Sequence, residues 1–212
     1  MQSKCLKISL IMSNITNNKT KNTNNNLTIF QHGEPILAQV AQTVHDVNSA
    51  EIKQLIIDLK ATVTEAKGVG IAAPQVGESL RLFLMCSAPS ERYPDAPLLP
   101  VSVIINPKII KTSEQQVLGW EGCLSVKGKR ALVPRYSHIE VSYSDETGLT
   151  HHKHLTDFLA RIFQHELDHL NGITFIERLN NEDDAIDEQQ WQKQQKVRKS
   201  NSAKLTIVDN KT

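Results

Sequence analysis

The sequence predicts an α+β fold in a single domain. Short apolar and β-branched runs lie in the middle of the chain, and helical patterns lie on either side of them. The 212 residues are the length of one domain, or at most of two small ones, and the chain shows no internal repeat. We therefore expect one globular unit in which strands and helices are segregated along the chain.

The composition excludes several classes of protein. With 39% hydrophobic and 22% charged residues, the chain is neither a disordered protein nor a fibre. The 24 Lys and Arg residues against 23 Asp and Glu leave a net charge of +1, whereas binding to phosphate backbones requires a concentrated basic face. The longest clean apolar run, residues 82–86, is far shorter than a membrane span of about 18 residues. We expect a soluble protein with no membrane and no specific nucleic acid as partner.

The three cysteines indicate a cytoplasmic protein. They are an odd number spread over a long chain, which is a poor disulfide framework, so a reducing compartment is expected. Residues 4–12 weakly resemble a signal peptide, but Lys7 and Ser9 break the apolar run and no small-residue cleavage site follows.

Residues 1–28 are expected to form a flexible N-terminal extension. They are rich in Asn, Thr and Lys, contain no acidic residue and show no helical or strand period. An organelle-targeting presequence is the alternative, but such leaders are usually rich in arginine, and the first arginine here is Arg81. Met12 is a second candidate for the true start of the protein.

A first helix and three strands are expected in the first two thirds of the chain. The helix begins behind Ser49, a candidate cap, and ends before Gly68, and it is expected to pack without carrying chemistry. Its apolar residues recur at helical spacing and are Ile52, Leu55, Ile56, Leu59 and Val63. The strands are short apolar runs bounded by Pro, Gly, Asn or Asp, namely Arg81–Cys86, Ser102–Ile105 and Ile139–Tyr143, with Cys86 as a core residue.

Two more helices are expected in the last third. One begins near Thr156 or Asp157, either of which can cap it, and ends at Asn171-Gly172. The other spans about residues 182–199, because its acidic start and basic end suit the helix dipole. Beyond Ser200 we expect fraying.

The helix that ends at Asn171 carries His165-Glu166-Leu167-Asp168-His169. A spacing of four residues places the two imidazoles one turn apart on one face, where they can bind one metal ion. Glu166 can then reach a water on that metal. For this motif alone, the alternative is two unrelated histidines with a salt-bridging glutamate.

Two other segments supply groups that this helix lacks. EGCLS, residues 121–125, offers Cys123 as a third ligand, since a free cysteine in the cytosol is buried, reactive or metal-bound. GVGIAAPQ, residues 68–75, contains glycines that let another backbone approach closely. It ends in Gln75, whose amide can donate a hydrogen bond. A phosphate-binding loop is disfavoured, because Pro74 follows where a lysine or a third glycine is needed.

In this order, GVGIAAPQ, EGCLS and HELDH resemble the three motifs of the peptide deformylases. The match extends through GEPILAQVAQTV, PDAP and KGKRALVPR and covers about residues 29–180. The resemblance implies an enzyme that removes the N-formyl group from the initiator methionine of nascent polypeptides. It implies mostly antiparallel sheets around a central helix bearing HELDH, with a catalytic domain at residues 29–180 and a C-terminal helix and frayed tail at residues 181–212.

By position in these motifs, the resemblance implies that Cys123, His165 and His169 are the metal ligands and that Glu166 is the general acid/base. Three protein ligands leave one tetrahedral position for water, whose pKa the cation lowers. Imidazole and thiolate suit Fe, Zn, Co or Ni. The family usually works with Fe(II), so Fe(II) is expected first, with Zn, Ni or Co as alternatives.

The resemblance also implies groups that contact the substrate. Gln75 and the backbone N–H of Leu124 are expected to donate to the oxyanion. The Val69-Gly70 backbone is expected to pair with the substrate as an added strand. A methionine pocket is expected beside the metal, and its candidate residues, which could equally be plain core, are Phe158, Ile162 and Val69. The expected partner is a formyl-methionyl nascent peptide, with transient association with the ribosome as a further expectation.

Glu121 is expected to pair with Arg135 and to hold the loop of Cys123. It lies two residues before the ligand, and the chain returns through residues 130–134 as a loop that enters a strand. Two solvated charges are the alternative. Lys127 departs from the family pattern, which often has proline there, so the loop geometry after Val126 is in question.

Three rival interpretations of the metal motif remain. A metzincin requires a third histidine where Phe175 stands. A thermolysin-like peptidase site could use Glu188, but Cys123 and Gln75 would then have no role. A structural site requires a fourth ligand, and Cys86 is the only spare thiol outside the N-terminal extension.

Overall fold

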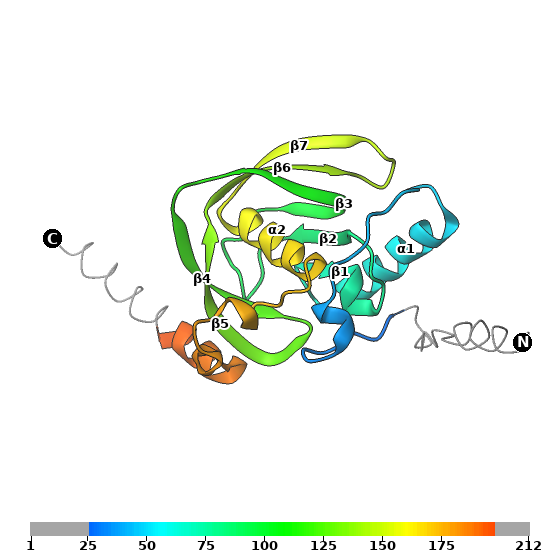
Figure 1. Ribbon diagram of the computed structural model, residues 1–212. Coiled ribbons are helices and arrows are strands. Elements are labelled where there is room, and N and C mark those ends of the chain that lie inside the picture. Colours follow the sequence, from blue (N-terminus) through cyan, green and yellow to red (C-terminus); the bar gives the residue numbers. More distant parts are fainter. Residues whose placement is uncertain (1–25, 198–212) are drawn as a thin grey trace, which may run out of the picture.

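The computed structural model describes residues 26–197, in which a central helix lies between two antiparallel sheets (Figure 1). The larger sheet has the strand order β1-β2-β3-β6-β7, and the smaller has the order β4-β5-β8. The strands are β1 (Gly70–Ala72), β2 (Leu82–Ser87), β3 (Leu99–Thr112), β4 (Gln116–Cys123), β5 (Val126–Tyr136), β6 (His138–Ser144), β7 (Thr150–Thr156) and β8 (Ile186–Asp187). The helices are α1 (Ala50–Glu65), α2 (Asp157–Leu170) and a C-terminal helix at residues 188–197. The predicted α+β class, the antiparallel sheets and the central helix are confirmed.

The first predicted helix is confirmed as α1. Ser49 is its N-cap, and the Ser49 side chain accepts a hydrogen bond from the backbone N–H of Ile52 at 3.3 Å. The apolar face of α1 is buried in one core cluster together with residues of β1, β2 and β3. The periodicity of that face was therefore sufficient to place the helix.

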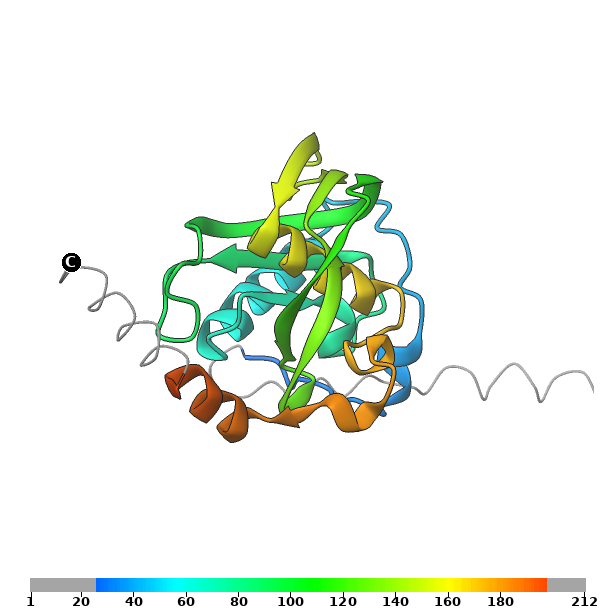
Figure 2. The same cartoon turned by 90° about the vertical axis from the view of Figure 1, so that its left-hand side faces the viewer.

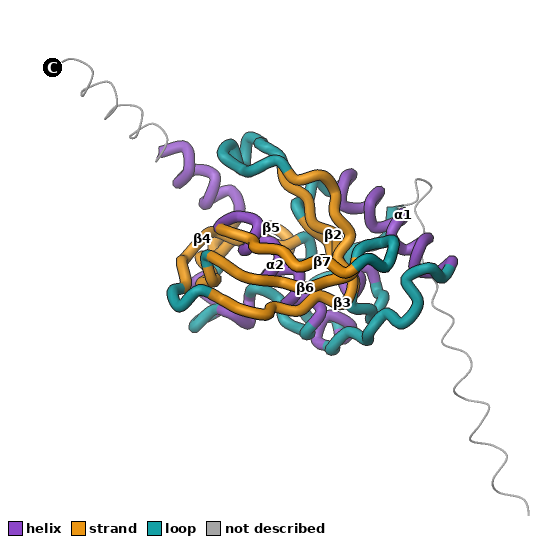
Figure 3. The backbone as a smooth tube through the Cα atoms, turned by 90° about the horizontal axis from the view of Figure 1, so that it is seen from above, coloured by secondary structure: helices purple, strands orange, loops and turns teal. Residues whose placement is uncertain are grey.

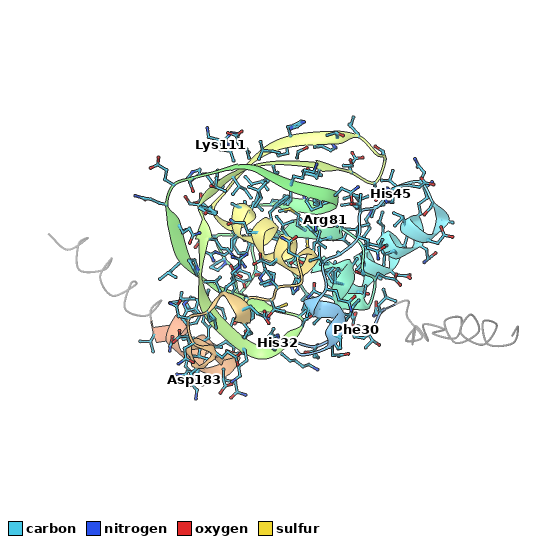
Figure 4. All side chains as sticks on the ribbon, viewed as in Figure 1. Phe30, His32, His45, Arg81, Lys111 and Asp183 are labelled. Atoms are coloured by element: carbon cyan, nitrogen blue, oxygen red, sulfur yellow. The ribbon has the colours of Figure 1, made fainter. Side chains whose placement is uncertain are left out.

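Helix α2 is confirmed with the predicted bounds, but its start is not capped as expected. Thr156 occupies the N-cap position without a side-chain capping bond. At the other end, Arg81 donates to the carbonyl of Leu170 at 3.2 Å and to Oδ1 of Asn171 at 3.1 Å, which ties the end of α2 to the start of β2 (Arg81 is labelled in Figure 4). The fully buried rings of Phe163 and Phe83 pack edge to face at 5.3 Å between centroids.

The three predicted strands are present as β2, β3 and β6, but β3 is much longer than Ser102–Ile105. The sequence did not predict β1, β4 or β7 and anticipated only part of β5. Strand β7 is mostly polar and pairs along its whole length with β6 at the edge of the larger sheet (Figure 3), so its backbone pairing rather than its side chains fixes it.

The predicted start of the C-terminal helix at residue 182 was wrong. Glu182–Asp184 is a single 3₁₀ turn, and Ile186 and Asp187 pair with Arg130 and Lys129 of β5. The helix begins only at residue 188, because the backbone before it belongs to the smaller sheet (Figure 2). The expected end of this helix and the frayed tail lie outside the described residues.

Within the described residues, packing already includes Leu27, which lies two residues before the expected start of the catalytic domain at residue 29. Leu27 is buried in the same core cluster as α1, and its backbone N–H donates to the hydroxyl of Thr62 at 3.0 Å. The expected extension, as far as residue 25, lies outside the described residues. Among residues 26–197, no helix is both long and apolar enough to cross a membrane.

Candidate active site

The two predicted histidines and the predicted cysteine come together between β4 and α2. Cys123 ends β4, and His165 and His169 lie one turn apart on α2. Their three ligand atoms lie within 4.8 Å of one another, and the sulfur of Cys123 is 3.1 Å from Nε2 of His169. In the part of the chain that the structure describes, no other group of three His, Cys, Asp or Glu side chains is so closely gathered.

Cys123 is presented by the tight connection between β4 and β5. Cys123 and Val126 face each other in the ladder, so Leu124 and Ser125 form the turn. The backbone N–H of Ser125 donates to the sulfur at 3.3 Å, and Nε2 of Gln75 lies 3.5 Å from it. The β-ladder resumes at Val126, so Lys127 does not disrupt the loop.

A buried carboxylate, Glu121, connects the two elements of this site. Its Oε2 accepts a hydrogen bond from Nδ1 of His165 at 2.8 Å. The predicted pair with Arg135 is present as two hydrogen bonds of 2.9 and 3.0 Å, with both side chains about 4% exposed. Burial alone would raise the pKa of Glu121, but the hydrogen bonds from His165 and Arg135 outweigh it and hold that pKa well below its usual range.

The network contains three residues that the sequence analysis did not identify. Arg161 donates to Oε1 of Glu121 at 2.8 Å, and Asp168 accepts hydrogen bonds from Arg135 and Arg178. Arg161 precedes His165 by one helical turn and Asp168 lies inside HELDH, so helical spacing places both near the histidines, although it does not reveal their partners.

Glu166 lies on the floor of the site with an unsatisfied carboxylate oxygen. It is 3% exposed, and Oε2 has no hydrogen-bond partner among the described residues. Burial raises the pKa of Glu166 to about 7. A Cβ atom at Gly70 would lie 2.2 Å from Oε1, so only glycine admits the carboxylate here.

The two histidines differ in their surroundings. Burial lowers the pKa of His169 well below its ordinary value, which favours the neutral ring that a metal ligand requires. Burial also opposes charge on His165, but hydrogen bonds with Cys123 and Glu121 raise its pKa well above the ordinary value. The sulfur of Cys123 and the carboxylate of Glu121 therefore both stabilise a proton on the His165 ring. One sulfur and two imidazoles are a ligand set that fits a divalent cation and leaves a coordination position open.

The predicted oxyanion donors lie beside the sulfur. Gln75 is buried, and its Oε1 accepts a hydrogen bond from the backbone N–H of Ala72 at 2.8 Å, which fixes the orientation of the amide. Its Nε2 points towards Cys123 and lies 3.0 Å from the hydroxyl of Ser125. The carbonyl of Leu124 accepts from Nε2 of Gln31 at 3.2 Å, so the turn itself is held from the N-terminal side.

A cleft of about 610 Å³ opens over this site. Of the predicted site residues, all except the deeper His169 line it, and these are Val69, Gly70, Gln75, Cys123, Leu124, Phe158, Ile162, His165 and Glu166. Ile162 is also part of the core behind the cleft, and Phe158 packs on Tyr93 with ring centroids 4.9 Å apart. Strand β1 lies at the edge of the larger sheet and pairs with β2 on one side only.

The residues of the rival interpretations lie elsewhere. The carboxylate of Glu188 is held by Arg130 at the wall of the cleft. Cys86 donates towards the carbonyl of Gly68 at 3.5 Å and is not part of the ligand group. Neither residue can therefore act as a further ligand in this arrangement.

Comparison with known proteins decides the family. The sequence model of the family described as polypeptide deformylase matches residues 26–185. The chain belongs to the peptide deformylase family. It is therefore a metal-dependent hydrolase that removes the N-formyl group from N-terminal methionine.

Relatives and solved structures agree with this assignment. Peptide deformylase 2 of Nostoc sp. is 52% identical over 166 residues, which are 78% of this chain and 93% of the relative. Peptide deformylase 2 of Shewanella oneidensis is 51% identical over 155 residues, 73% and 85% of the two chains. The class I type b peptide deformylase of Acinetobacter baumannii bound to Met-Ala-Ser has a TM-score of 0.71 and 44% identity, covering 73% of this chain and 98% of its own. The deformylase of Synechococcus elongatus in complex with actinonin has a TM-score of 0.66 and 37% identity, covering 77% and 84%.

Gly70→Ala tests the close approach of β1 to the catalytic helix. The added methyl group would overlap Glu166, so the carboxylate or the strand must move. We expect turnover of a formyl-Met peptide to fall about 100-fold, the scale for loss of a positioned acid/base, in a folded protein that keeps its metal. Ile71→Val, one residue along the strand, is the control and should leave turnover within a few-fold. Wild-type turnover by Gly70→Ala would show that the contact is unimportant.

Proposed function

We propose that Cys123, His165 and His169 together hold one divalent cation at the floor of the cleft. The observation that supports this best is the gathering of their ligand atoms within 4.8 Å beside the unsatisfied carboxylate oxygen of Glu166. Fe(II) is the proposed physiological cation, with Zn, Ni and Co as alternatives, since thiolate and imidazole ligands suit all four. When bound, the cation supplies a Lewis acid and a water acidified to near neutrality.

We further propose that Glu166 is the general acid/base. Its carboxylate accepts a proton from the water that attacks the formyl carbon and then delivers that proton to the methionine amine as the C–N bond breaks. The site favours this role, because Glu166 is buried, one of its oxygens lacks a protein partner, and the carboxylate faces Gly70 at the cleft. The fixed amide of Gln75 and the backbone N–H of Leu124 donate to the oxygen that becomes negative, and each such donor contributes about 3 kcal/mol in comparable sites.

The edge position of β1 supports a route for the substrate. We propose that the peptide extends along the Val69-Gly70 backbone as an added strand, with its methionine side chain in a pocket lined by Phe158, Ile162 and Val69. Residues 29–180 would then form the catalytic domain, on which part of the segment 181–212 packs. We propose that the protein acts in the cytoplasm on nascent chains and associates transiently with the ribosome.

One assay tests the proposed function. The purified protein is given a formyl-Met peptide and, separately, an amino-terminally blocked peptide with only internal bonds to cleave. Release of formate from the first with no cleavage of the second is expected, because the proposed site places the formyl group of an N-terminal formyl-methionine at the metal. Cleavage of internal bonds instead would favour the endopeptidase alternative.

Cys123→Ala tests the ligand set against the only other cysteine in the described residues, Cys86. Loss of the sulfur leaves two histidines, so the variant should lose most of its metal and nearly all turnover. Cys86→Ala should lose neither. Metal content is measured by elemental analysis of anaerobically purified protein. Stoichiometric metal in Cys123→Ala would contradict the assignment.

Glu166→Gln separates a catalytic role from a ligand role. The amide has nearly the same shape but cannot accept the proton, so turnover should fall at least about 100-fold while metal content is unchanged. Turnover and metal are measured on the same preparation. Loss of the metal would instead identify Glu166 as a ligand.

Ile162→Trp tests the methionine pocket. A larger side chain in the pocket should raise KM for formyl-Met peptides in a folded, metal-loaded protein. If Ile162 acts only in the core, overpacking should lower the unfolding temperature and leave KM unchanged. Steady-state kinetics and thermal unfolding of the same sample distinguish the two outcomes.

A further inference from the structure

Arg161 joins the helix that carries the histidines to the strand that leads to Cys123. It lies on α2 one turn before His165, and its side chain is only 12% exposed. Its guanidinium reaches β4 at two backbone carbonyls, donating to Val117 at 2.7 Å and to Gly119 at 3.3 Å. Arg161 therefore holds the main chain of β4 directly.

The same guanidinium also reaches the neighbouring strand and the central carboxylate. It donates at 2.8 Å to the carbonyl of Val133, which faces Gly119 in the β4–β5 ladder. It donates at 2.8 Å to Oε1 of Glu121, whose other oxygen accepts from His165. A planar fork of five N–H donors suits this set of acceptors, whereas a lysine ammonium is a single point that cannot span them.

Gly119 makes room for this arrangement. A Cβ atom at this position would lie 2.6 Å from Cζ and 2.7 Å from Nε of Arg161. Any other residue at position 119 would therefore push the guanidinium away from β4. The glycine and the arginine, 42 residues apart in the chain, form a matched pair.

We propose that Arg161 is a positioning residue of the metal centre. It holds β4, and with it Glu121 and Cys123, at a fixed distance from the α2 histidines, so that the sulfur and the imidazoles converge on one point. This inference rests on the ligand set proposed above. It adds that convergence depends on a side chain that is neither a ligand nor in contact with the reacting atoms.

The test compares metal release from four variants of the full-length protein. Arg161→Met removes the donors and keeps the aliphatic stem, Gly119→Ala displaces the guanidinium, and the double variant combines the two changes. Arg178→Met is the matched control, because Arg178 binds Asp168 of the same network, is 43% exposed and makes no hydrogen bond or ion pair with β4 among the described residues. Each protein is loaded with Co(II), its thiolate-to-cobalt absorption band is recorded, and release to a chromogenic chelator is timed well below the unfolding temperature.

We expect Arg161→Met and Gly119→Ala each to release cobalt about 10- to 100-fold faster and to shift the thiolate band, the range found for groups that orient metal ligands. Because both changes remove the same contact, the double variant should release cobalt within about threefold of Arg161→Met. Arg178→Met should retain the wild-type band and release rate. These readouts separate positioning from general destabilisation, which would lower the unfolding temperature without changing the band of the folded protein.

Three results would overturn the proposal. The first is wild-type release and absorption by Arg161→Met, and the second is fully additive effects in the double variant. If Arg161→Met does not fold, Arg161→Lys replaces it in the test. The third result is then cobalt release at the wild-type rate by Arg161→Lys. Failure of the unaltered protein to bind Co(II) would refute the ligand assignment itself. If the unaltered protein binds Co(II) and Arg161→Met releases it at the same rate, only the role of Arg161 is refuted.

Discussion

The architecture of the active site depends on one buried carboxylate. Glu121 accepts hydrogen bonds from His165, Arg135 and Arg161, and it lies two residues before Cys123. Removing a carboxylate from water is expensive, and only a full set of charged donors compensates for it. Glu121 can therefore be buried only when the strand that carries it and the helix that carries the histidines are correctly placed.

Charged residues beside Glu121 also tie the smaller sheet to helix α2. Arg135 also binds Asp168, which lies between the two histidines in sequence and accepts from Arg178 as well. The network thus contacts HELDH at both His165 and Asp168. Removing one partner of the buried Arg135–Asp168 pair typically costs about 3–5 kcal/mol, whereas Arg178 is 43% exposed and contributes less. In contrast, Glu166 has a carboxylate oxygen with no hydrogen-bond partner among the described residues. The buried charges beside Cys123 and the two histidines are paired, whereas the carboxylate proposed to move a proton keeps an unpaired oxygen.

The sequence predicted the catalytic helix better than its surroundings. HELDH and the apolar period of α2 fixed its bounds and the pairing of His165 with His169, because helical spacing is a local property. The contact of Glu121 with Arg135 was also anticipated. Strands β4 and β7 were not predicted. Their polar or exposed residues show no clear alternation, and their places depend on pairing with distant segments.

Arg161 was missed for a similar reason, since its partners on β4 and β5 become neighbours only in the folded chain. The late start of the C-terminal helix depends on a two-residue pairing with β5 that charge patterning cannot reveal.

The most direct test of this account is the metal affinity of Glu121→Gln, measured by competition with a chelator below the unfolding transition. The substitution keeps the shape and removes the charge that orients His165 and compensates the two arginines. Metal affinity should fall about 10- to 100-fold, while Glu188→Gln, the same change in a carboxylate that binds Arg130 at the cleft wall, should leave affinity unchanged. Wild-type affinity in a folded Glu121→Gln protein would contradict the claim that this carboxylate organises the site.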